Sequence, residues 1–313
     1  VSAVVLFIRP IAINIYCRKK YIIDKNVPQD LDSVAQKWDN FGQSIAQYVH
    51  TKTSYFYMTF FLGFLEVSIY SVYSLITTSL SAVITSISTG FVAGLGNIYA
   101  NNEKDNFKKI FSLYEFVNHF VSYVFFTIAI ITMIPFVKVY TANIVDSSQY
   151  IIPIFGALLI IGELIYCIRL PYYYTITNAG HFKQIKKSAY VEAGLNIVIS
   201  LLLIFPLGLT GLAIGTMLAM TYRTVYLMIY CAKNITKISI IASAKKLFVY
   251  SSAGAIAVIV CSLVKYTVVN FFQWLVYAAL IGGIVFVIFA GVSVALFKDD
   301  IKTLLQKLRN VVK

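Results

Sequence analysis

Charged residues inside long apolar stretches are the part of this 313-residue sequence best placed to do chemistry. A charged side chain at the centre of a bilayer costs at least about 2.5 kcal/mol, so it usually faces a protein interior or a wet cavity. The residues with this placement are Arg9, Glu163, Arg169, Glu192 and Arg223. An alternative, that the charge snorkels to the membrane surface or caps a helix, applies to Glu66, Glu115, Glu192 and Arg223.

Arg169 has the most informative neighbours. It precedes Pro171 by two residues, and a proline inside a helix removes a backbone donor and favours a kink. Tyr166 and Tyr173 are spaced to share its helix face. A guanidinium binds phosphate through two parallel hydrogen bonds, and aromatic rings stack on sugars. The alternative is that Arg169 only pairs with an acid or a carbonyl group on another helix.

Glu163 and Arg169 are six residues apart, which is roughly 240° around an ideal helix, so they do not form a simple pair within one helix. Other chemistry is sparse. The histidines His50, His119 and His181 have no metal-binding spacing, and no serine nucleophile motif occurs. We therefore expect no metal site, no cofactor and no enzyme activity. The four cysteines are expected to be small apolar side chains: Cys17, Cys167, Cys231 and Cys261.

The composition predicts an α-helical membrane protein around these residues. The chain is 59% hydrophobic and 12% charged, with a mean hydropathy of +0.79, whereas a soluble domain carries about 25% charged residues. No polar stretch exceeds about 35 residues, which is too short for a separate soluble domain. The net charge of +13 fits contact with anionic lipid headgroups better than nucleic acid.

Helices are expected to span the bilayer, because lipid leaves no partner for an unpaired backbone group. One partial and eight fuller spans are predicted, at 1–16, 52–65, 69–97, 112–136, 150–176, 188–206, 210–231, 247–266 and 272–297. Most of the 26 Lys and Arg residues fall in every second connection, and the opposite connections hold only Lys138 and Lys265. This asymmetry predicts that the basic connections and the C-terminus are cytoplasmic.

Two amphipathic helices are predicted outside the spans. An apolar stripe is formed by Leu31, Val34, Trp38, Phe41, Ile45 and Tyr48. We expect this helix to lie along the inner membrane surface. The tail has a second stripe, formed by Ile301, Leu304, Leu305 and Leu308. Tight turns are expected at 64–68 and 206–211. The glycine pairs Gly90 with Gly94 and Gly211 with Gly215 are expected to let backbones approach closely.

Several segments together resemble the bacterial polysaccharide-biosynthesis flippases of O-antigen or capsule type, within the multidrug/oligosaccharidyl-lipid/polysaccharide exporter superfamily. The segments are IRPIAINIYCRKKY, KWDNFGQSIAQYVHTKT, EVSIYSVYSLI, IYCIRLPY, NAGHFKQIKKSAYVEAGLNIVIS and GLTGLAIGTMLAMTYRT, and they span essentially the whole chain in order. The resemblance implies an all-α transporter of two six-helix lobes around a central cavity. It also implies export of undecaprenyl-pyrophosphate-linked oligosaccharide from the inner to the outer leaflet by alternating access.

This resemblance implies that the first lobe is absent from the chain. The expected parts are 1–16 as the end of a first-lobe helix, 17–51 as the cytoplasmic interlobe loop with its amphipathic helix, 52–231 as the second six-helix lobe, 232–297 as two trailing helices and 298–313 as a cytoplasmic tail. The expected location is the bacterial inner membrane. Expected partners are the lipid-linked oligosaccharide and membrane lipids, with a polysaccharide polymerase and glycosyltransferases as further candidates and no nucleic acid.

On this reading Arg169 faces the cavity and holds the pyrophosphate. Arg9 and Arg223 add positive charge, the sugar contacts Tyr166, Tyr172 and Tyr173, and Pro171 is the hinge. Glu163 and Glu192 are the candidates for ion coupling. Three alternatives remain: a cation-coupled multidrug antiporter of the same superfamily, whose cavity should be rich in acids; a membrane glycan-assembly enzyme, which should have a large extramembrane loop; and a scaffold that transports nothing.

Overall fold

A computed structural model describes residues 2–21, 37–101, 103–264 and 266–312. The chain divides into two compact units, Val1–Trp38 and Asp39–Lys313. The first unit holds helix α1 (Ser2–Lys20), which contains Pro10 and ends with three basic residues. Two residues of the predicted interfacial stripe, Leu31 and Val34, lie outside the described residues, as does Lys265.

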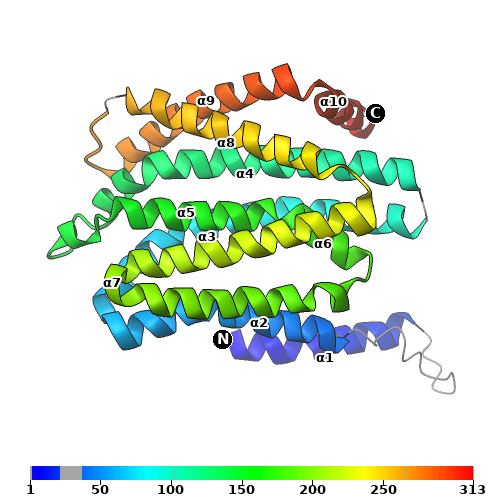
Figure 1. The fold of residues 1–313 in the computed structure, drawn as a ribbon, viewed down its shortest axis with the longest axis horizontal. Coiled ribbons are helices and arrows are strands. Elements are labelled where there is room, and N and C mark those ends of the chain that lie inside the picture. Colours follow the sequence, from blue (N-terminus) through cyan, green and yellow to red (C-terminus); the bar gives the residue numbers. More distant parts are fainter. Residues whose placement is uncertain (1, 22–36, 102, 265, 313) are drawn as a thin grey trace. The chain divides into compact units, whose positions relative to one another are not determined.

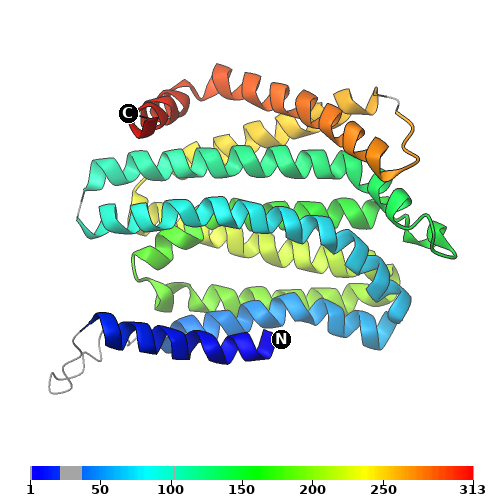
Figure 2. The same ribbon diagram turned by 180° about the vertical axis from the view of Figure 1, so that it is seen from behind.

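The second unit is built from antiparallel helices (Figures 1 and 2). Its elements are α2 (Lys37–Tyr57, of which the first two residues belong to the first unit), a π-helical turn (Met58–Leu62), α3 (Phe64–Ala100), α4 (Lys104–Tyr140), a 3-10 turn (Ser147–Tyr150), α5 (Pro153–Ile168), α6 (Leu170–Asn178), α7 (Phe182–Cys231), a second π-helical turn (Ala232–Thr236), α8 (Ile240–Ser262), α9 (Phe271–Leu296) and α10 (Lys298–Val312). No strand occurs among the residues that the structure describes.

Six stretches of the described residues are helical, long and apolar enough to cross a membrane. One of them contains all of α7, which bends at Gly208, where φ is 54° and ψ is −133°, and so holds two predicted spans. The six stretches therefore account for every predicted full span except 52–65, which forms the end of α2 and the π-helical turn. The fold is that of an all-α, multi-pass membrane protein.

Helix α4 lies at the centre of the second unit and packs against α3, α5, α8 and α9 (Figure 1). The largest apolar cluster joins α4 to its neighbours through fully buried side chains such as Phe126, Met133, Tyr73 and Phe155. A second cluster joins α4 to α8 and α9. Since lipid is as apolar as these side chains, close packing rather than exclusion of water stabilises such contacts within a bilayer.

The two halves of α7 approach closely at Gly211 and Gly215. A Cβ atom at Gly211 would collide with the carbonyl group of Leu203, and one at Gly215 would collide with Ser200. The predicted close approach is confirmed for this pair. The prediction for Gly90 and Gly94 is wrong, because a Cβ atom at either position meets nothing within 4 Å. These two glycines lie on an exposed face of α3, whereas Gly211 and Gly215 lie in a tight hairpin.

The described part of the amphipathic segment and the beginning of the membrane segment predicted at 52–65 form one continuous helix, α2, which ends at Tyr57. Its apolar residues Phe41, Ile45 and Tyr48 are exposed, and its opposite face is buried, with Gln43 and His50 at 3% and 2% exposure. The buried face is polar because α7 offers it hydrogen-bond partners: Gln43 Nε2 donates to the carbonyl of Phe182 at 3.0 Å. The polar side of α2 is therefore the side that packs against α7, opposite to the one predicted from the apolar stripe.

The connections that carry most of the basic residues lie at one end of the second unit. Figure 1 places the α3–α4, α6–α7 and α7–α8 connections and α10 there, with the bend of α7 and the α4–α5 connection at the other end. This arrangement is the one that the charge asymmetry requires. Which end faces the cytoplasm stays a prediction.

Candidate functional site

The site begins with a break between α5 and α6. α5 ends at Ile168, α6 begins at Leu170, and Arg169 lies between them. Pro171 has no N–H group, so the carbonyl oxygen of Cys167, four residues earlier, loses its helical donor. Asn118 Nδ2 of α4 donates to this oxygen at 2.9 Å, and Asn118 Oδ1 accepts from Ser88 Oγ at 2.8 Å. The predicted irregularity before Pro171 is confirmed, and a neighbouring helix supplies the missing donor.

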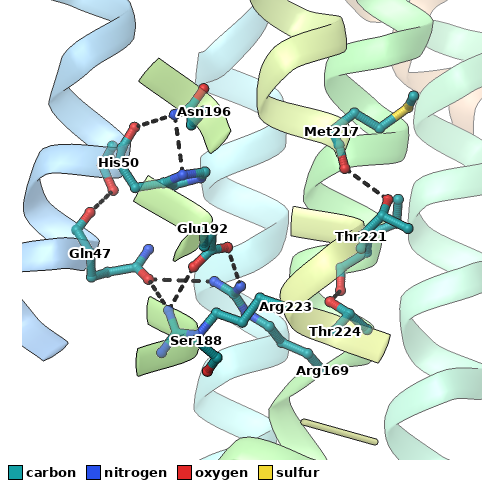
Figure 3. A network of polar contacts seen from close by, with 12 residues as sticks. Gln47, His50, Arg169, Ser188, Glu192, Asn196, Met217, Thr221, Arg223 and Thr224 are labelled. Carbon is teal, nitrogen blue, oxygen red and sulfur yellow. Dashed lines mark hydrogen bonds and ion pairs between the residues drawn. The ribbon is translucent and has the colours of Figure 1, made fainter. Parts of the chain in front are cut away.

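A second side chain supports the break from the other side. The Ile165 carbonyl oxygen accepts a long backbone hydrogen bond of 3.3 Å from Arg169 and a second bond of 3.2 Å from Thr224 Oγ1 of α7. The break is therefore held by α4 and α7 together. As a consequence, the backbone of Arg169 is fixed and its guanidinium group points toward α7 (Figure 3).

Arg169 and Arg223 share one carboxylate. Arg169 Nη1 lies 2.5 Å from Glu192 Oε1, and Arg223 Nη1 lies 2.7 Å from Glu192 Oε2 (Figure 3). All three side chains are buried, with Glu192 at 1% exposure and both arginines at 3%. The group carries two positive charges and one negative charge, so it keeps an excess positive charge in a low-dielectric interior.

Helix α2 contributes an amide to the same group. Gln47 Oε1 accepts from Arg169 Nη2 at 3.4 Å and from Arg223 Nη1 at 3.2 Å. Further along α7, Asn196 makes a second set of polar contacts with α2. Its Nδ2 atom contacts His50 Nδ1 at 3.1 Å and donates to the His50 carbonyl at 3.0 Å. These polar contacts therefore connect α2, the α5–α6 break and both halves of α7 (Figure 3).

Both arginines line a pocket of about 250 Å³, here called the arginine pocket. Its lining residues are Gln43, Ser44, Gln47, Tyr166, Arg169, Leu170, Tyr173, Tyr174 and Arg223. No acidic side chain of the described residues lines it, because Glu192 lies behind the two guanidinium groups. Arg169 Cζ lies 4.7 Å from the centre of the Tyr166 ring, and Arg223 Cζ lies 5.9 Å from that of Tyr173.

The structure brings together four of the residues predicted from the sequence to bind substrate: Arg169, Arg223, Tyr166 and Tyr173. It does not bring in Tyr172, which is buried on another side of α6, where its hydroxyl group donates to Glu115 Oε1 at 2.7 Å. Adjacent residues on a helix point about 100° apart, and Tyr172 lies on the side of Tyr173 that is turned toward α4. Arg9 lies on α1 in the first unit, and its relation to the pocket stays a prediction.

The structure also distinguishes between the alternatives considered for the charged residues. Glu192 and Arg223 neither snorkel nor cap a helix, because both are buried and paired with each other. Arg169 does pair with an acid on another helix, as one alternative held, and it also lines a pocket. The remaining candidate, Glu163, lines a separate small cavity and accepts a hydrogen bond from Ser81.

Sequence reasoning missed the glutamines of α2. Gln43 and Gln47 both line the arginine pocket, and His50 follows on the same helix. Their spacing of four and three residues marks one polar helix face opposite the apolar stripe. This polar spacing is present in the sequence, but the apolar stripe on the other side of the helix predicted a helix on the membrane surface.

A second ionic cluster joins α4, α8 and α10. Lys246 Nζ lies 3.1 Å from Glu115 Oε2 and 3.3 Å from Asp300 Oδ2. Ser112 Oγ also donates to Asp300, at 2.9 Å. Glu115 accepts from Ser243 Oγ as well as from Tyr172. This cluster anchors the first turn of the tail helix to the core and accounts for the burial of Glu115.

The fold is that of an all-α membrane transporter. A solved structure described as "Lipid II flippase MurJ, inward closed conformation" is similar to this chain with a TM-score of 0.62 and 18% sequence identity. The similarity covers 90% of this chain and 58% of that chain, so this chain spans little more than half of the length of its structural neighbour. No protein-family profile matches the sequence, and no curated protein matches it. At this level of identity the similarity establishes the fold alone.

Proposed function

We propose that the protein moves a lipid-linked, pyrophosphate-bearing sugar across the bacterial inner membrane, from the inner to the outer leaflet. The observation that carries the proposal is the arginine pocket: two buried guanidinium groups and three tyrosines line one cavity that has no acidic wall in the described residues. Arginines are well suited to the two phosphate groups, since a guanidinium can bind phosphate oxygens in parallel.

Glu192 explains how two arginines are held together before substrate arrives. It neutralises one of their two charges and orients both forks. A pyrophosphate entering from the pocket side would meet the guanidinium faces that Glu192 leaves open. Arg223 Nε is buried and has no hydrogen-bond partner among the described residues, so one donor of this guanidinium group is unsatisfied. The substrate would restore charge balance to a site that is one positive charge in excess.

The tyrosines are suited to the sugar next to the pyrophosphate. Tyr166 and Tyr173 lie beside the arginines, and Tyr174 completes the wall. An aromatic ring offers an apolar face to the C–H groups of a sugar, and its hydroxyl group offers a hydrogen bond. The lipid tail needs no pocket, since it remains in the bilayer beside the helices.

Movement of the substrate would follow alternating access. The α5–α6 break at Arg169 and Pro171 is the point at which a long helix can bend, because the backbone hydrogen bond to the Cys167 carbonyl is replaced there by a side-chain bond from Asn118. We propose that residues 52–231 form the second of two lobes and that a first lobe completes the cavity. We also propose that the tail is cytoplasmic and that Arg9 adds charge to the completed cavity.

Two kinds of lipid-linked substrate deserve comparison. The similar solved structure is described as a lipid II flippase, whereas the sequence resemblance favours an undecaprenyl-pyrophosphate-linked oligosaccharide for surface polysaccharide. We propose the latter, with a polysaccharide polymerase and glycosyltransferases as further partners. An antiporter of cationic drugs would need an acidic cavity, and the two arginines that line this pocket disfavour it.

The test is a flipping assay with the intact protein, including its proposed first lobe, in proteoliposomes. An undecaprenyl-pyrophosphate-linked oligosaccharide is placed in one leaflet, and its accessibility to an enzyme added outside is followed over time. Lipid II and a cationic dye are run in parallel. Flipping of the oligosaccharide lipid that is lost in Arg169→Ala supports the proposal. Flipping of lipid II alone changes the substrate, and dye transport alone rejects the proposal.

A further inference from the structure

Glu163 is a partly buried acid that does not line the arginine pocket. It lies on α5 and lines a cavity of about 40 Å³ between α2, α3, α5 and α7, which is large enough for one or two water molecules. Other residues at this cavity include His50, Ser54, Tyr70 and Thr216.

The carboxyl group of Glu163 is hydrogen-bonded to a hydroxyl group and has no basic partner among the described residues. Ser81 Oγ donates to Glu163 Oε2 at 2.7 Å, and the same hydroxyl group accepts from the Cys167 thiol at 3.6 Å. No ion pair to Glu163 occurs within the described residues, although Glu115 and Glu192 each have a basic partner. A carboxylate without a cation in a low-dielectric interior is costly, and a neutral carboxyl group avoids this cost.

A second titratable side chain, His50, lines the same cavity. His50 is buried at 2% exposure, and its Nε2 atom has no hydrogen-bond partner among the described residues, whereas Nδ1 contacts Asn196. The cavity is therefore lined by two side chains that can bind a proton, Glu163 and His50.

The other titratable groups around Glu163 do not replace a counterion. Tyr70 of α3 shares the cavity, Tyr166 lies on the same helix as Glu163, and Arg169 follows the end of that helix. The guanidinium group of Arg169 is directed to Glu192 and Gln47. The residues that α7 contributes to the cavity, among them Thr216 and Met220, carry no charge.

We propose that Glu163 is a proton-binding site whose occupancy controls the affinity of the arginine pocket. This inference rests on the proposed function, because it concerns the binding of an anion. With the proton on Glu163, the region of the two arginines keeps its excess positive charge and binds pyrophosphate tightly. When the proton leaves the site through the cavity, the carboxylate adds one negative charge near the arginines and weakens anion binding. Because such coupling is reciprocal, bound pyrophosphate also favours the protonated carboxyl group.

The first test needs no lipid substrate. Infrared difference spectra of the purified intact protein, recorded between acidic and alkaline pH, should show the C=O band of a protonated carboxyl group. Glu163→Gln should remove this band, and it should fold normally because glutamine imitates the neutral acid. Glu66→Gln, which alters a glutamate in the first turn of α3, is the matched control and should keep the band. A band that persists in Glu163→Gln overturns the proposal.

The second test measures coupling. The affinity of the wild-type protein for undecaprenyl pyrophosphate should rise by about fivefold or more as pH falls through the range in which the band appears. The affinity of Glu163→Gln should not change over this range. A sodium-dependent loss of the band at constant pH would make the site a sodium site and overturn the proton proposal. Absence of any pyrophosphate binding, with the band intact, would instead count against the proposed function.

Discussion

Asn118 on α4 donates its side-chain N–H to the Cys167 carbonyl oxygen of α5 at 2.9 Å, at the position where Pro171 leaves that oxygen without a backbone donor. Removing this donor should destabilise the protein, since an unsatisfied buried carbonyl group costs about 1–3 kcal/mol. We therefore expect Asn118→Ala to lower the free energy of unfolding in detergent by this amount.

The cause can be isolated with a double-mutant cycle. In Pro171→Ala the backbone N–H returns, so Asn118→Ala should cost less in that background, with a coupling energy of about 1 kcal/mol. Ser88→Ala removes the neighbouring hydrogen bond to Asn118 Oδ1 and leaves the Cys167 bond in place, so it serves as the control. If the effects of Asn118→Ala and Pro171→Ala simply add, Asn118 does not substitute for the lost donor.

Glu192→Gln should be strongly destabilising. It leaves two buried guanidinium groups without their shared carboxylate, and breaking a buried ion pair typically costs about 3–5 kcal/mol. Asp39→Asn is the control, because its pair with Lys186 is partly exposed and should be worth less than about 1 kcal/mol. Thermal melting should also show that inorganic pyrophosphate stabilises Glu192→Gln more than the wild type. Equal stabilisation of both proteins would argue against pyrophosphate binding at the arginines.

Arg169→Lys should not restore function. Lysine keeps the charge but lacks the planar fork that contacts Glu192 and Gln47 together. We expect flipping in proteoliposomes to fall by about tenfold or more, which corresponds to about 1.4 kcal/mol of lost interaction. Lys186→Arg, a charge-conserving change at a partly exposed pair, should have little effect. Normal flipping by Arg169→Lys would show that only the charge at position 169 is required.

The glycines of α7 and α3 should respond in opposite ways. Gly215→Ala should destabilise the protein, because the new Cβ atom would collide with the backbone and side chain of Ser200. Gly94→Ala should be neutral or stabilising by about 0.5–1 kcal/mol, since its Cβ atom meets nothing and alanine favours a helix. Thermal unfolding of the two variants checks this difference. A destabilised Gly94→Ala would indicate that another surface covers this face of α3 in the intact protein.

The anchoring of α10 can be tested at two adjacent acids. Asp300 contacts Lys246 and Ser112, whereas Asp299 is exposed. Asp300→Asn should therefore increase hydrogen exchange in α10, and Asp299→Asn should not. Equal exchange in the two variants would mean that the apolar contacts of Ile301 and Leu304 hold the helix by themselves.

The sequence predicted the helical fold and part of the site for identifiable reasons. Long apolar runs have few structural options in lipid, so the spans followed from length and hydropathy. Arg169 and Pro171 stood out because both are costly inside a membrane helix. The partner of Arg169 could not be predicted, since Glu192 and Arg223 meet it only through the packing of α7 against α5. The role of α2 was also hidden, because an apolar stripe alone does not tell which face of a helix is buried.

Binding of undecaprenyl pyrophosphate to the intact protein in detergent tests the central claim most directly, with undecaprenyl phosphate as the competing ligand. The wild type should prefer the pyrophosphate, and both Arg169→Ala and Arg223→Ala should lose most of this preference. Lys186→Ala, which removes one positive charge outside the arginine pocket, should keep it. If the arginine variants discriminate between the two lipids as well as the wild type does, the arginine pocket is not the pyrophosphate site.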